Sequence, residues 1–386
     1  MQTMPRPQLR AQASAPSDAE IFLFSLQERD FFRTFAQNTR DMAEEIIAVD
    51  NVALQPLIEN ISVAINEARK KVASHINATM TQAYWQIGKY IVEYEQGGQA
   101  KVAYGTSTLT ELSRQLTTRF GRGFSRPNLV NMRKFYLLYP NCQTVSDILT
   151  WSHICELMQA EDDLERSFYE KECIAQKWDV RTLRRQMNSA LFLRLAATKD
   201  TKGVLALAND GITVQKPEDA VRDSYTLEFL GIHEDYRFSE TLLEQRIIDN
   251  LQLFLLEMGK GFTFVKRQYP ITVNNRHYHC DLVFYHRILR CFVLIDLKRD
   301  GVQHEDIGQM NMYLGYFAKE ENLPDDNPPI GIILSHYKDD LLVEYATYGM
   351  NTNLFVSKYE LYLPDKEQLR KIVGKIVDSD ESKAGT

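Results

Sequence analysis

Two carboxylates and a lysine lie in one short segment, 279–298, which reads HCDLVFYHRILRCFVLIDLK. Asp281 begins the first of two apolar runs, and Asp296 and Lys298 end the second. Runs of this length, rich in Val, Ile and Phe and separated by a short basic turn, predict two paired strands. Side chains alternate along a strand, so Asp296 and Lys298 share one face. Because charged groups at a buried strand end are costly, we interpret them as groups that serve a metal ion and its substrate.

The chemistry that this arrangement predicts is metal-assisted hydrolysis of a phosphodiester bond. The reaction needs an in-line water, relief of charge on the phosphate and help for the leaving oxygen, and Mg²⁺ prefers carboxylate and water oxygens. We expect Asp281 and Asp296 to bind Mg²⁺, with Mn²⁺ as a substitute, and the carbonyl of Leu297 to add a ligand. Lys298 would orient or activate the attacking water and offset charge in the transition state. Glu244, on a preceding predicted helix, would hold a second metal ion or a bound water.

Two further polar side chains, Gln309 and Tyr313, are four residues apart and therefore share one face of the next predicted helix. From that face they could reach the phosphate or Lys298. Taken singly, each candidate also has a structural interpretation as a cap, a core edge or a solvated strand end. The joint spacing of the acids and the lysine within one hairpin favours a site. A zinc alternative is raised by His277, His279, His286 and His304, but their spacing matches no HExxH or Cys/His ligand pattern, so we do not expect zinc.

A second group of candidate functional residues lies in 107–140, where two predicted helices flank a Gly-Arg-Gly break. Ser125 is predicted to cap the second helix, with Pro127 in its first turn. A helix, a glycine-containing turn and a helix form a helix-turn-helix arrangement, and no acidic residue occurs between positions 112 and 146. The alternative is a solvated basic face on a structural bundle. We predict contacts to nucleic-acid phosphates and base edges from Arg114, Arg119, Arg122, Ser125, Arg126, Asn128, Asn131, Arg133 and Lys134.

The order of these patterns predicts a multidomain α+β protein: an all-α front domain of helix-turn-helix type, then an α/β domain with a central mixed sheet covered by helices. The two short strands expected before the hairpin are 262–268 and 271–273. The boundaries that we predict are a flexible tail at 1–18, a helical arm at 19–50, a helical nucleic-acid-binding domain at 51–200, a polar linker at 201–220, a nuclease domain at 221–376 and a disordered tail at 377–386.

Composition restricts the partners and the compartment. The 386 residues carry a net charge of −7, so nucleic-acid contacts must come from local basic patches. The five cysteines form no CxxC pair, which favours reduced thiols in a cytoplasmic protein. No apolar run approaches the length of a membrane span, and residues 1–18 do not resemble a signal peptide. A homodimer is expected if the substrate is a duplex, because each chain carries one such site.

Several segments resemble the PD-(D/E)xK nuclease superfamily, and more closely its YhcG-like bacterial nucleases. The resemblance covers roughly residues 55–370. The matching segments are LEQRIIDNL from Leu243, FLLEMGKGF from Phe254, DLVFYHR from Asp281, LRCFVLIDLK from Leu289 and GQMNMYL from Gly308, with YWQIG from Tyr84, LTWSH from Leu149 and WDVRTLRRQ from Trp178 upstream.

The resemblance implies a restriction-endonuclease-like core, a winged-helix or helix-turn-helix type front domain, and Mg²⁺-dependent cleavage of nucleic acid, most simply DNA, in DNA processing or genome defence. The superfamily's metal acids correspond to Asp281 and Asp296, its lysine to Lys298, its helix acid to Glu244 and its glutamine to Gln309. One departure is Asp296, where relatives with this front domain usually carry Glu. A second is Cys280, which stands where the superfamily motif can have Pro. The rival hypothesis is a catalytically inactive nuclease fold retained as a DNA-binding or assembly protein.

Overall fold

The computed structural model describes residues 37, 58–69, 71–72, 76–96, 105–141, 148–232, 238–349 and 353–384. The chain divides into two compact units, 1–76 and 77–386. In the first unit, residues 58–69 are helical. The predicted tail at 1–18 and all but one residue of the predicted arm at 19–50 lie outside the described residues. Among the described residues, no helix combines the length and the apolar character that crossing a membrane requires.

The front part of the second unit is helical, as the sequence predicted. Side-chain caps define where helices begin: Asp162 accepts from the backbone N–H groups of the next turn, and Asp179 and Asp200 do the same for the helices that follow them. Phe168, Tyr169 and other buried residues form the core of this part. Its helices after the helical stretch 77–96 are α2 (Gly105–Phe120), α3 (Arg126–Leu138), α5 (Trp151–Leu157), α6 (Asp163–Gln176), α7 (Val180–Asn188), α8 (Leu191–Ala196) and α9 (Thr201–Asp210).

Residues 201–220 do not form the predicted polar linker. They contain α9 and the short helix α10 (Pro217–Ala220). Val204, Leu207 and Ala208 are buried in the helical core, and Ser167 on α6 donates to the carbonyl of Ala208 at 2.8 Å. The turn residues suggested a linker, but the apolar face of α9 is covered by α6, so this segment belongs to the helical core.

The sheet of the C-terminal part has six strands in the order β1-β6-β5-β4-β3-β2. Pairing is antiparallel between β2, β3 and β4 and parallel from β4 through β5 and β6 to β1. This arrangement confirms the predicted mixed sheet. The strands are β1 (Ser224–Thr226), β2 (Phe262–Val273), β3 (Arg276–His286), β4 (Cys291–Gly301), β5 (Ile330–Tyr337) and β6 (Leu354–Glu360).

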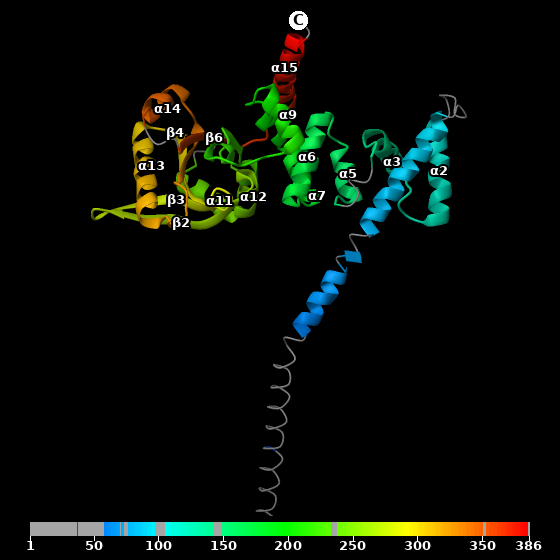
Figure 1. Cartoon of the computed structure of the whole chain (residues 1–386), viewed down its shortest axis with the longest axis horizontal. Coiled ribbons are helices and arrows are strands. Elements are labelled where there is room, and N and C mark those ends of the chain that lie inside the picture. The colour runs from blue at the N-terminus through cyan, green and yellow to red at the C-terminus, as the bar shows by residue number, and fades with distance from the viewer. Residues whose placement is uncertain are drawn as a thin grey trace, which may run out of the picture. The chain divides into compact units, whose positions relative to one another are not determined.

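Helices cover both faces of the sheet. On one face, α11 (Glu240–Asp249) and α12 (Leu251–Met258) pack against side chains such as Leu282 and Ile295. On the other face, α13 (His304–Tyr316) packs against side chains such as Val283 and Leu294 (Figure 1). The alternation along β4 therefore directs its even-numbered residues, including Asp296 and Lys298, to the α13 face.

Two predicted local features differ from the structure. The strands expected at 262–268 and 271–273 form one strand, β2, because a register irregularity between Phe264 and Lys266 lets the pairing continue. The tail expected to be disordered from 377 instead belongs to α15 (Lys366–Ala384). Val373 of α15 is buried in the helical core, and Thr201 donates to the carbonyl of Ile376 at 2.7 Å. The charged composition concealed an apolar stripe that docks on this core.

Candidate active site

The β3–β4 hairpin brings the two central acids together. Its register pairs Leu282 with Ile295, so the neighbouring acids Asp281 and Asp296 lie at the same end of the hairpin. Asp281 accepts a hydrogen bond from the backbone N–H of Leu297 at 2.8 Å through its Oδ2. One carboxylate is thus held by the backbone of the strand that carries the other.

Asp296 is a buried acid in an unfavourable electrostatic position. Its side chain is 4% exposed, and its Oδ2 lies 2.8 Å from Lys298 Nζ. That contact lacks hydrogen-bond geometry, and Oδ2 forms no hydrogen bond with the described residues. Burial and the negative charge of Asp281 raise the pKa of Asp296 to about 6, although Lys298 acts in the opposite direction. The positive charge of Lys298 therefore only partly offsets the cost of ionising Asp296.

Lys298 is held as a cation between two acids. Its Nζ lies 2.8 Å from Asp296 and 3.4 Å from Asp306, which is on α13. Burial alone would lower the pKa of Lys298, but the charges of Asp296, Asp306 and Glu240 outweigh it and raise the pKa above its ordinary value. Lys298 is therefore protonated at neutral pH in this structure, and its ammonium group supplies positive charge where a metal ion bound by Asp296 would supply it.

Glu244 reaches the same region from α11. The helix begins at Ser239, whose hydroxyl accepts from the backbone N–H of Leu242 at 3.1 Å, and this start places Glu244 in the first turns with its side chain buried. Glu244 Oε1 pairs with Arg267 Nε at 2.9 Å, and Oε2 accepts from Gln268 Nε2 at 2.8 Å. The helix acid is thus held by two consecutive residues of β2.

Gln268 connects the helix acid to the strand acid, and sequence reasoning did not single it out. Its Nε2 donates to Glu244 and also to Asp281 Oδ1, the latter at 2.9 Å. Its φ of +47° lies in the left-handed region, which a residue with a side chain adopts only when its surroundings enforce it. The signal that could have found it is the two-residue turn at Asn274 and Asn275, because counting back along β2 from that turn places Gln268 opposite Asp281.

Gln309 and Tyr313 share one face of α13, as predicted, but they contact each other and the backbone of β3. Gln309 donates to the hydroxyl of Tyr313, and that hydroxyl donates to the carbonyl of His279 at 3.0 Å. Burial raises the pKa of Tyr313 to about 12. Their expected reach to a phosphate or to Lys298 stays a prediction.

The donor atoms of this site suit a hard divalent cation. Asp296 Oδ2 and Glu244 Oε1 are buried carboxylate oxygens that each lie beside one cation, Lys298 and Arg267, and form no hydrogen bond with the described residues. Within the described ranges, no three His, Cys, Asp or Glu side chains form a ready ligand cluster. Mg²⁺ does not require one, since it usually keeps several waters and binds through one or two carboxylates together with substrate phosphates. The residues present therefore fit Mg²⁺ or Mn²⁺ better than they fit zinc.

The helix-turn-helix candidates fall into two sets. Five of them make contacts within the protein. Arg114 pairs with Glu111, Arg133 pairs with Glu95, Lys134 donates to the carbonyl of Met158, Asn131 donates to Cys155 Sγ, and Asn128 accepts from Trp151 Nε1 at 2.9 Å. Four of these side chains connect α3 to neighbouring elements, whereas Arg114 pairs with Glu111 within α2. Contact of all five with nucleic acid stays a prediction.

The other four candidates, Arg119, Arg122, Ser125 and Arg126, are exposed around the turn between α2 and α3. Ser125 occupies the N-cap position of α3, as predicted, but its side chain makes no capping hydrogen bond. Its hydroxyl therefore stays accessible. Together with Arg114 and Lys134, which are also exposed, these four side chains form the part of the predicted surface that faces solvent.

Two family models match the chain. Residues 218–373 match the family model described as the YhcG PDDEXK nuclease domain, and residues 60–194 match the DUF1016 N-terminal domain. A protein of Escherichia coli (strain K12) named "Putative nuclease YhcG" is 36% identical over 347 residues, which cover 82% of this chain and 92% of that protein.

Among solved structures, a repair endonuclease from Pyrococcus abyssi is similar to a smaller part of the chain. It is 22% identical, with a TM-score of 0.25, over 34% of this chain and 50% of that one. The assignment does not depend on that likeness, because the identity to the Escherichia coli protein extends through both the helical and the nuclease parts. The chain belongs to the YhcG family of PD-(D/E)xK nucleases.

Proposed function

We propose that this chain hydrolyses phosphodiester bonds in nucleic acid, with DNA as the expected substrate and Mg²⁺ as the cofactor. The observation that carries the proposal is the convergence of Asp281, Asp296 and Lys298 at one end of a hairpin. There, the repulsion between two acids and the burial of one raise a carboxylate pKa to about 6. Such a concentration of negative charge is of little use to a scaffold, but it is what a cation site requires.

Each residue has a distinct role in this proposal. Asp281 and Asp296 would hold the first metal ion, and Glu244 would hold a second ion or a water. The bound ion relieves charge on the phosphate and makes a water more acidic. Lys298, protonated in this structure, would stabilise the charge that develops on the phosphate oxygens.

The front domain would position the substrate through the exposed side chains at the turn between α2 and α3. Arg119, Arg122 and Arg126 would contact phosphates, and Ser125 would donate a hydrogen bond at the start of α3. Each chain carries one set of acids of this kind, so cutting both strands of a duplex would require two copies of the chain, and we include a homodimer in the proposal.

The test is cleavage of a panel of labelled linear and branched DNAs, with single strands and RNA included, in Mg²⁺, in Mn²⁺ and in EDTA. Lys298→Ala should reduce cleavage by about 100-fold or more while DNA binding is retained, because one transition-state contact is lost. The matched control is Lys358→Ala, since Lys358 lies in the same cross-strand row, two strands away, and pairs with Glu360 at 3.2 Å in a similar way.

The rival function, an inactive nuclease fold that binds DNA, makes the opposite forecast. A wild-type protein that binds but cleaves no member of the panel in either metal would support it. Equal cleavage by wild type and Lys298→Ala would refute the role given to the lysine. Loss of cleavage in Lys358→Ala as well would show that the assay reports folding rather than chemistry.

A further inference from the structure

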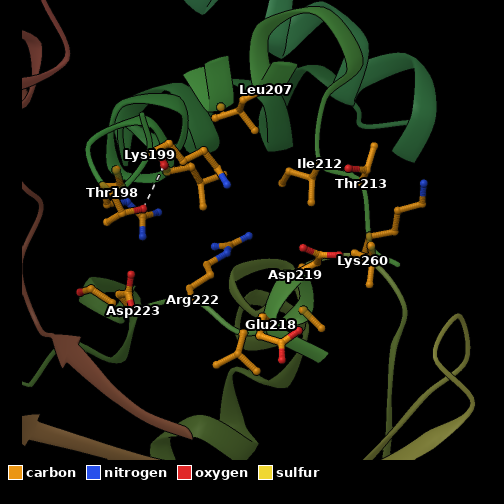
Figure 2. Close-up of a pocket in the computed structure, with 18 of the residues that line it drawn as sticks. Thr198, Lys199, Leu207, Ile212, Thr213, Glu218, Asp219, Arg222, Asp223 and Lys260 are labelled. Atoms are coloured by element: carbon orange, nitrogen blue, oxygen red, sulfur yellow. Dashed lines mark hydrogen bonds between the residues drawn. The ribbon is translucent and has the colours of Figure 1, made fainter. Parts of the chain in front are cut away.

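A cavity of about 540 Å³ lies between the helical core and the nuclease sheet, away from the acids described above. Its walls come from α9, from the segment around α10 and β1, and from the turn between α12 and β2 (Figure 2). This volume lies within the range of sites that bind small molecules. Neither the three central nuclease residues nor the helix-turn-helix line it.

Behind the cavity, one glutamate faces two arginines. Glu257 on α12 is fully buried. Arg194 makes a bidentate pair with it, at 2.7 Å to Oε1 and 3.2 Å to Oε2, and the backbone N–H of Thr226 donates to Oε1 at 2.8 Å. Arg222 Nη1 lies 3.4 Å from the same Oε1 but forms no hydrogen bond. Because Arg194 and Thr226 already use the oxygens of Glu257, the Nη1 group of Arg222 is left without a hydrogen-bond acceptor among the described residues. The buried Glu172 acts on Arg222 only through its charge.

The guanidinium of Arg222 faces the cavity. Figure 2 shows it reaching into the space between Lys199 and Ile212. The side chain is only 10% exposed, and the hydrogen bonds of the described residues include none from its guanidinium. Gly259 leaves room for it, since a Cβ at that position would lie 3.3 Å from Arg222 Nη2. Arginine has five N–H donors, and a buried cation with unused donors is costly unless a partner satisfies it.

The walls carry charged groups of both signs. Lys199 and Lys260 line the cavity, and neither forms an ion pair with another described residue. The acids on the walls are engaged elsewhere or exposed to solvent: Asp219 accepts from the backbone N–H groups of Gln215 and Lys216, Glu218 pairs with Lys216, Glu360 pairs with Lys358, and Asp210 and Asp223 are exposed.

We propose that this cavity binds a small phosphorylated ligand of mononucleotide size. Its phosphoryl group would contact Arg222, Lys199 and Lys260, because an arginine fork matches phosphate oxygens and lysines add charge. Apolar walls that include Met258 and Phe262 would accept the rest of the ligand. Such a ligand would bind at the junction of the two parts of the chain and would regulate or stabilise it, independently of the nuclease site.

The test is isothermal titration of the full chain with AMP, with inorganic phosphate and with adenosine as the uncharged match. AMP should bind and phosphate should compete with it, whereas adenosine should bind at least about tenfold more weakly. Lys199→Gln and Lys260→Gln should each weaken AMP binding by about tenfold, the loss expected for one charged contact. The control is Lys202→Gln, because Lys202 is exposed on the same helix, α9, and does not line the cavity.

Arg222→Gln should abolish AMP binding, and a circular dichroism spectrum would establish whether that variant folds. If Arg222→Gln does not fold, the binding measured for the two lysine variants tests the proposal. Equal binding of AMP and adenosine, or AMP binding that neither lysine variant weakens, would overturn the proposal. So would binding by a 5′-phosphorylated oligonucleotide but not by AMP, which would identify a strand end as the ligand. Because the readout is binding, these results stand apart from the outcome of the cleavage assays.

Discussion

Replacing Asp296 by Asn should stabilise the metal-free protein at neutral pH, although Asp296 is assigned to the active site. Asparagine resembles the protonated form of the acid in size and shape. The pKa of Asp296 is raised from 3.8 to about 6 by burial and by Asp281. At about 1.4 kcal/mol per pH unit, that difference corresponds to about 3 kcal/mol.

The sign follows from linkage. A carboxyl group whose pKa is raised in the folded state binds its proton more tightly there, so its favourable contribution is complete below the unfolded-state pKa near 4 and is lost as pH rises through 6. Asparagine has no proton to lose. The variant and the wild type should therefore be similarly stable near pH 4, and the variant should be more stable by up to about 3 kcal/mol at pH 7.5.

The assay is urea unfolding of both proteins in EDTA at pH 4.5, 6 and 7.5, followed by tryptophan fluorescence and circular dichroism. Asp300→Asn is the control, because Asp300 is exposed on the same strand and its hydrogen bond with Arg299 lowers its pKa. Mg²⁺ should stabilise the wild type and have little effect on Asp296→Asn, since a ligand stabilises only the protein that binds it. A variant less stable than wild type at pH 7.5, or a difference that does not change with pH, would refute the electrostatic account of the site.

Three further predictions concern residues other than Asp281 and Asp296. Gln268→Leu should reduce cleavage by about 10- to 100-fold, because the bridge that orients two acids is lost; unchanged turnover would make Gln268 a packing residue only. Replacing Arg119, Arg122 and Arg126 together by Ala should reduce the slope of log binding constant against log salt by about 3, as three phosphate contacts would; a slope equal to that of wild type would exclude this surface. Val373→Ala should lower the free energy of unfolding by about 2 kcal/mol, because the side chain is buried on α15, and no change in a urea titration would mean that α15 does not pack there.

The nuclease hairpin could be predicted because its information is local. Strand alternation and the short turn between the two runs place Asp281, Asp296 and Lys298 together from sequence spacing alone. The mixed sheet with helices on both faces also follows from the order of apolar patterns, and the structure confirms it. These features depend on neighbours a few residues apart, so the periodicity of the chain encodes them directly.

The local sequence pattern did not predict contacts between residues that are far apart in the sequence. The local pattern did not show that Arg133, predicted to contact nucleic acid, pairs with Glu95, 38 residues away. Residues 201–210 looked like part of a linker, but their apolar face docks on α6.

The sequence by itself determined which acids and which lysine share a hairpin, because the two-residue period of a strand requires it. Only the tertiary structure decided that Gln268 bridges Glu244 and Asp281, and that Arg222 lines a cavity with its Nη1 group free of hydrogen bonds to the described residues. Those arrangements arise from the packing of helices on a sheet, where side chains from distant segments compete for the same buried acceptors. Which side chain reaches a given acceptor depends on the three-dimensional packing of these segments, and the local sequence pattern does not contain that information.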